Sequence, residues 1–225
     1  MSLLGTLYKE PFHLAREMKL GRPPELAPYL SQLRTWIAAQ FEVNVLHVEI
    51  DYVKWPEGNV PRLRVVLETD SERSSWHPNT RWEIRADIGR SVLEKLRSLA
   101  VETGVEEDHS RTFLIVDSFE DACLALAGNS FDVGPSKRFI QDLPALPIWD
   151  VEAFFRHTVV FLHTEQDIRW VIKSRWGEQI RRWCFRGNKQ FDEFDYLTEQ
   201  NFHFKFDSKE NVDKNFGGCL DRYWH

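Results

Sequence analysis

One local pattern occurs three times along this chain: a short apolar segment, then a Ser or Thr, then acidic or amide residues. It is found at residues 112–122, 158–168 and 204–212, with Ser118, Thr164 and Ser208 as the hydroxyl residues. A Ser or Thr at a helix start accepts a hydrogen bond from a free backbone N–H, and acidic side chains favour the positive end of the helix dipole. The pattern therefore predicts three strand-to-helix joints, in a fold that mixes strands with helices.

The spacing of these joints bears on the architecture and on function. The hydroxyl residues lie 46 and 44 residues apart, which is compatible with a duplicated α+β unit. Similar joints also arise by convergence, because helix caps use few residue types. A helix start can also bind an anion. Here carboxylates already occupy the first turns, so we interpret the joints as structural caps.

Periodicity predicts most of the other elements. Alternating apolar and polar residues predict strands, which cover residues 43–53, 63–67, 191–197 and 202–207. Helical spacing of apolar residues predicts helices over residues 24–40, 87–102 and 165–186. Gly177 is expected to kink or divide the last of these helices. The first two strands are close enough to form an antiparallel hairpin, and residues 70–79 have the composition of a polar loop.

These elements describe an α+β fold, with a mixed or antiparallel sheet and helices packed mainly on one face. Prolines become frequent before residue 147, and 17 of the thirty aromatic residues follow that point. We therefore expect two α+β halves of similar construction, residues 1–146 and an aromatic-rich half at 147–225. They form either two domains or one continuous domain.

Composition excludes several classes of protein. The chain has 225 residues, 42% of them hydrophobic and 28% charged, as is usual for a globular protein. Its net charge of −6 opposes a general affinity for nucleic acid. No signal peptide is evident, and the apolar runs of the chain are far too short to span a membrane. The three cysteines are widely spaced, which is typical of reduced thiols, so we expect a cytoplasmic protein.

Sequence motifs of the large enzyme classes are missing. There is no phosphate-binding glycine loop, no nucleophile elbow, no His-Glu-x-x-His and no Cys-x-x-Cys. We therefore assign no catalytic residue and no cofactor, and favour a non-enzyme. The alternative is a metal-dependent hydrolase or nuclease that would use His163, Asp195 and Asp207. His157 cannot share an ion with His163, because six residues of strand separate them by about 20 Å. A site that joins His163 to His47 or His203 on a neighbouring strand remains open.

A second polar set lies on one predicted strand. His47, Glu49 and Asp51 alternate with apolar residues and therefore share one face of that strand. Paired carboxylates at this spacing can hold a cation or act as acid and base. Alternation alone also places polar residues there, so we expect a solvated sheet face.

The strongest candidate for a binding surface lies on the predicted helix at 165–186. Trp170, Arg169, Lys173 and Arg181 fall on roughly one side of it, opposite an apolar stripe that includes Ile168, Ile172, Trp176 and Ile180. Trp and Arg are enriched at binding hot spots. The sequence thus predicts a non-catalytic binding or regulatory protein whose partner is another protein. An acidic segment of the same chain, residues 102–121, is the competing candidate to cover this patch.

Overall fold

The computed structural model describes residues 9–56, 58–77, 83–132, 134–143, 146–154 and 156–224. The chain forms two compact units, residues 1–122 and 123–225, so that the division falls within a helix. No helix within the described ranges is long and apolar enough to cross a bilayer. The described elements confirm the predicted α+β class, with two three-stranded sheets of mixed direction.

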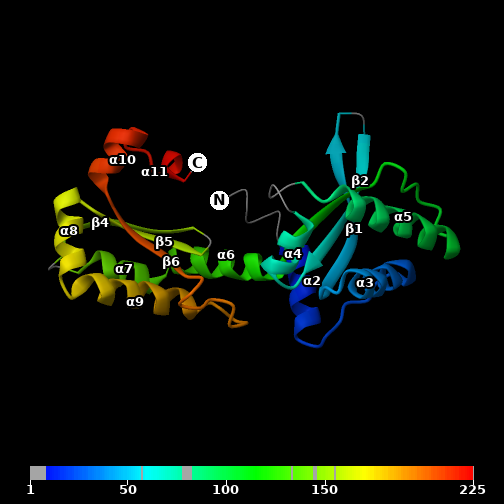
Figure 1. Cartoon of the computed structure of the whole chain (residues 1–225), viewed down its shortest axis with the longest axis horizontal. Coiled ribbons are helices and arrows are strands. Elements are labelled where there is room, and N and C mark those ends of the chain that lie inside the picture. Colours follow the sequence, from blue (N-terminus) through cyan, green and yellow to red (C-terminus); the bar gives the residue numbers. More distant parts are fainter. Residues whose placement is uncertain are drawn as a thin grey trace. The chain divides into compact units, whose positions relative to one another are not determined.

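Unit 1 builds its sheet from a hairpin and one later strand. Its elements are α2 (Lys9–Lys19), α3 (Pro28–Phe41), β1 (Val45–Trp55), β2 (Gly58–Leu67), α4 (Asp70–Trp76), α5 (Ala86–Glu102) and β3 (Phe113–Ser118). The strand β2 is central: it pairs antiparallel with β1 and parallel with β3. The helices α3 and α5 lie along the same side of the hairpin (Figure 1) and bury Leu33, Ile37, Val92 and Leu96 against it.

Unit 2 repeats this plan. The helix α6 (Phe119–Asp132) crosses the division between the units and is followed by α7 (Pro135–Gln141). The remaining elements are β4 (Ile148–Phe154), β5 (His157–Leu162), α8 (Glu165–Lys173), α9 (Trp176–Lys189), β6 (His203–Ser208), α10 (Lys209–Phe216) and α11 (Leu220–Tyr223). The strand β5 is central, antiparallel to β4 and parallel to β6. Residue 147, after which the sequence becomes rich in aromatic residues, immediately precedes the first strand of this sheet.

Helices cover both faces of the second sheet. The main core lies between the strands and α6, α7, α8 and α9, and includes Phe131, Val160, Val171 and Ile180. A smaller cluster on the opposite face joins Val159 and Phe161 to Val212 of α10 and to Tyr223. Figure 1 shows α7 and α9 on one side of these strands and α10 and α11 on the other.

Equivalent strands pair in the same register in the two sheets. Leu67 pairs with Ser118 in the first sheet, and Leu162 pairs with Ser208 in the second, in both cases at the carboxyl end of the parallel strands. The hairpins also share a register shift, or β-bulge, next to the first residue of β1 and of β4. A bulge is a defined backbone feature rather than a defect. The two units therefore have the same strand architecture, as the repeated pattern in the sequence suggested.

The strand-to-helix joints are as predicted, and the structure adds a fourth. Thr164 and Ser208 accept hydrogen bonds from the N–H of Asp167 and of Asn211, and Ser118 accepts one from Asp121. Thr69 heads α4 in the same way and forms a reciprocal capping box with Glu72. The prediction of a polar loop over residues 70–79 was therefore wrong where α4 covers it. The acids there stabilise the first turn of a helix.

Two other predicted elements differ from the structure. The long helix expected over residues 165–186 is divided, as Gly177 suggested, but the two helices α8 and α9 meet at Ser174 and Arg175, before that glycine. The strand expected over residues 191–197 is an irregular loop. Its aromatic residues suggested a strand, but the side chain of Asp192 accepts hydrogen bonds from the N–H groups of Tyr196 and Leu197 and so fixes a turn.

Candidate functional site

The helix α8 carries three of the four predicted binding residues, and its ends are fixed by local hydrogen bonds. The Thr164 hydroxyl accepts from the N–H of Asp167, whose carboxylate accepts from the N–H of Thr164. At the other end, the chain turns at Ser174 and α9 begins. Gly177 is buried there, and a Cβ at this position would lie 3.1 Å from the carbonyl oxygen of Val171. This glycine permits the close approach of α9 to α8, so it does not open a surface to a partner.

The outer side of α8 exposes large apolar side chains. Val171 is buried and Ile168 packs against the same core, which fixes the inner side of the helix. Trp170 remains 49% exposed and Ile172 60% exposed. Ile172 was predicted to join the buried stripe, and this is wrong because α8 ends just after it and α9 takes over the core contacts. Both exposed side chains flank the outer side of one nine-residue helix.

The basic residues of the predicted patch separate into two groups. Arg169 and Lys173 lie on α8 beside the two apolar side chains, and both are exposed. The guanidinium of Arg169 donates a 3.4 Å hydrogen bond to the backbone oxygen of Glu165, within its own helix. Arg181 lies on α9 and forms an ion pair of 2.6 Å with Glu199. We therefore define the α8 face as Arg169, Trp170, Ile172 and Lys173, without Arg181.

A row of aromatic rings continues from the start of α9. The Arg175 guanidinium lies over the Trp176 ring at 5.4 Å, and Trp176 contacts Trp183 at 6.3 Å between ring centroids. Trp183 in turn packs edge-on against Phe139 of α7, which is 54% exposed. Trp176 was expected in the core, and the structure leaves it only half-buried. Arginine and aromatic side chains thus share this surface of unit 2.

The residues of the alternative metal site are not brought together. His163 is exposed beyond the end of β5. Asp207 belongs to a joint: it accepts hydrogen bonds from the Tyr223 hydroxyl at 2.5 Å and from the Asn211 amide at 2.9 Å. No group of three or more His, Cys, Asp or Glu side chains suited to a metal ion occurs within the residues that the structure describes.

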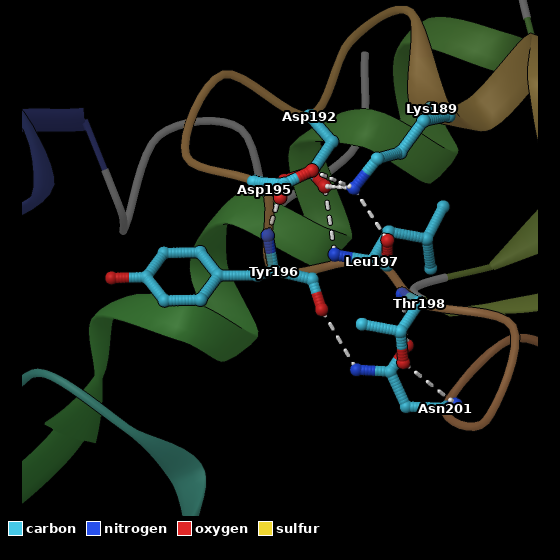
Figure 2. Close-up of polar contacts among 7 residues, drawn as sticks. All are labelled: Lys189, Asp192, Asp195, Tyr196, Leu197, Thr198 and Asn201. Carbon is cyan, nitrogen blue, oxygen red and sulfur yellow. Dashed lines mark hydrogen bonds and ion pairs between the residues drawn. The ribbon is translucent and has the colours of Figure 1, made fainter.

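Asp195, the third residue of that alternative, lies in the loop shown in Figure 2. The ammonium group of Lys189 lies 2.7 Å from the Asp192 carboxylate and 2.5 Å from that of Asp195. It also donates to the backbone oxygen of Leu197. The lysine thus occupies the position that a cation would take between these oxygens, and the arrangement is that of a closed structural loop.

Unit 1 contains a polar network that strand alternation did not predict. On the sheet face away from the main core, Arg64 lies 3.4 Å from Asp117 and 3.6 Å from Glu49, and His47 lies 3.5 Å from Glu49. His47 and Arg64 are 1% and 5% exposed, so the solvated face predicted for this strand is wrong at His47. The burial follows from α2, which packs on β1.

The atoms of this network are incompletely satisfied. Both ring nitrogens of His47, the Nε of Arg64 and the Oδ2 of Asp117 form no hydrogen bond with the described part of the chain. Burial raises the pKa of Asp117, and the charges of Arg64 and Arg62 only partly oppose this. Nearby, the hydrogen bond from Arg62 lowers the pKa of Asp51. The pKa values of these two carboxylates on one sheet face are therefore shifted in opposite directions.

Comparison with protein families and with curated protein sequences found no match to this chain. The candidate site therefore has to be judged from its own chemistry.

Proposed function

We propose that the protein is a non-catalytic binding protein that regulates a partner protein by occupying its surface, with the α8 face as the contact. The observation that carries this proposal is Trp170, which is 49% exposed and lies on α8 with two cationic side chains. Trp and Arg are enriched at interface hot spots, and Trp buries a large area while only two side-chain torsions are fixed. An exposed Trp contributes little to the fold of the free chain.

The charges on this face define the partner's chemistry. Arg169 and Lys173 are exposed, and Arg175 follows at the start of α9, whereas the chain as a whole has a net charge of −6. A basic face favours an acidic partner surface. The partner's contact is therefore expected to combine an apolar pocket for Trp170 with acidic residues around it.

The test begins with capture and ends with a measured affinity. A photo-crosslinking phenylalanine derivative in place of Ile172, which is exposed on the same face and leaves Trp170 intact, identifies the partner, which is then purified. Trp170→Ala should weaken binding about thirtyfold, because a hot-spot Trp contributes roughly 2 kcal/mol or more. The free energy of unfolding should change by less than about 0.5 kcal/mol, as for an exposed side chain.

Trp55 of unit 1 provides a matched control, because it is 55% exposed. Trp55→Ala should leave the affinity unchanged. Replacement of Arg169 and Lys173 by Gln removes their charges and should lower both the association rate and its dependence on salt. Equal losses from Trp55→Ala and Trp170→Ala, or a large loss of stability from Trp170→Ala, would contradict the proposal.

A further inference from the structure

Two histidines lie side by side at the start of the parallel strands in unit 2. His157 begins β5, His203 begins β6, and the two are paired in register. Their rings are stacked with centroids 4.8 Å apart and planes inclined by 18°. Both residues are exposed. In-register neighbours on parallel strands direct their side chains to the same face of the sheet, which explains the pairing.

The surroundings of His157 favour the neutral form of its imidazole. Burial lowers the pKa of His157, and the neighbouring charges of His203, Arg156 and Lys205 lower it further. Among the described residues, no carboxylate raises the pKa of His157. A neutral imidazole has a free nitrogen lone pair, which is the form that binds a metal ion. On the other side of His157, its partner in register is Phe154, whose ring contacts Trp224 at 5.5 Å.

We propose that His157 and His203 form a binding site for a divalent transition-metal ion of the Zn²⁺ class. Imidazole nitrogens prefer Zn²⁺, Cu²⁺ and Ni²⁺, whereas Mg²⁺ and Ca²⁺ prefer oxygen. Two Zn–N bonds of about 2.0–2.1 Å in a tetrahedral arrangement place the nitrogens about 3.3 Å apart. The rings are nearly parallel in the free chain, so binding requires both exposed side chains to rotate until one nitrogen of each points at the same ion.

The site supplies two protein ligands to the ion, and this number determines which kind of metal site it is. A structural zinc site has four protein ligands, and a catalytic one usually has three. Within the described residues no third His, Cys, Asp or Glu completes a group here. The ion therefore keeps at least two coordination positions for water or for a group on another molecule. Arg156 and Lys205 repel the cation, so the site is one of exchangeable binding rather than of permanent occupancy.

The test uses the full chain and zinc chloride as the probe. Isothermal titration up to ~1 mM zinc at neutral pH, in a buffer that does not bind metals, should show a site that His157→Ala or His203→Ala weakens at least about tenfold. His163→Ala is the matched control, because His163 is exposed beyond the opposite end of β5, and it should bind as the parent chain does. Magnesium chloride should show no binding.

A second measurement separates the pair from the cysteines, which also bind zinc. Imidazole resonances of His157 and His203 in nuclear magnetic resonance spectra should shift on addition of zinc, and zinc binding should fall as both rings are protonated at acid pH. Zinc binding that is unaffected by both alanine variants, or no zinc binding in the parent chain, would overturn the proposal. Near-ultraviolet circular dichroism checks that the variants remain folded.

Discussion

The two units use one backbone plan and differ on the same face of the sheet. In unit 2 the central strand presents Val159 and Phe161 on the face away from the main core, and α10 and α11 cover them. In unit 1 the positions with the same register hold Arg64 and Val66. Arg64 forms the polar network with Glu49 and Asp117, whereas Phe161 contacts Tyr223 at 5.1 Å.

The covering segments explain this difference. After α10, Gly217 adopts a left-handed conformation, with φ of 63°, and the chain turns back so that α11 packs on the sheet of unit 2. The corresponding helix after the sheet of unit 1 is α6, which continues for 14 residues to Asp132. The face of unit 1 is covered instead by α2. A sheet of this architecture can thus have either an apolar or a charged face, depending on which helix covers that face.

The largest expected effect concerns the apolar face. Phe161→Ala should destabilise unit 2 by roughly 3–5 kcal/mol, because the ring is fully buried and its removal leaves a cavity. Val66→Ala, at the same position of unit 1, should cost only about 2 kcal/mol, since two carbon atoms are lost. Urea unfolding with hydrogen exchange read out per strand measures both losses. Equal losses would show that the two faces are energetically alike.

A smaller and equal effect is expected at the joints that the units share. Thr69→Ala and Thr164→Ala each remove the hydroxyl of a capping box, and each should cost about 1 kcal/mol of unfolding free energy. Thr→Ser at either position retains the cap and serves as the control. A loss at only one of the two positions would show that the joints are alike in geometry but not in energy.

The smallest expected effect is a difference in pH dependence within unit 1. The raised pKa of Asp117 means that the folded chain holds this proton to higher pH than the unfolded chain does, so stability falls as pH rises through that window. The lowered pKa of Asp51 acts oppositely: its contribution is present above the ordinary pKa of Asp and is lost as pH falls through the folded pKa.

The measurement compares two neutral variants with the parent chain. Relative to Asp117→Asn, the parent should lose stability with rising pH, and relative to Asp51→Asn it should gain stability. Urea unfolding between about pH 3 and pH 7 covers both windows. Slopes of the same sign for the two variants would contradict the opposite environments of these carboxylates.

Local patterns predicted much of the fold. The hairpin and β6 follow from period-two alternation, β3 and β5 from short apolar segments, and three strand-to-helix joints from hydroxyl caps. All of these signals depend on neighbouring residues alone. The joint at Thr69 carried the same signal, since Thr69 and Glu72 have the spacing of a capping box, but the polar residues between them suggested a loop. The break between α8 and α9 was expected at Gly177 and lies two to three residues earlier, because apolar spacing continues through Ser174 and Arg175 and does not mark the exact position.

The candidate sites were harder to predict from local patterns than the fold was, because their geometry depends on tertiary structure. Exposure of Trp170 was expected from its place off the apolar stripe, whereas the pairing of Arg181 with Glu199 depends on a loop next to the segment that was predicted as a strand. The stacked pair of His157 and His203 depends on strand register, which alternation alone does not determine for two segments far apart in sequence. Burial of His47 depends on α2, which packs on β1 from outside the hairpin.

The shared β-bulge and capping joints have a consequence for how the gene can vary. Such features require only a backbone geometry and a hydroxyl or acidic side chain at a few positions, so many codons satisfy them. Residues such as Arg64 and Val159, which occupy the same register position in the two sheets, can therefore differ without a change in the strand plan. A search for ancestry within this chain should therefore compare registers rather than residues.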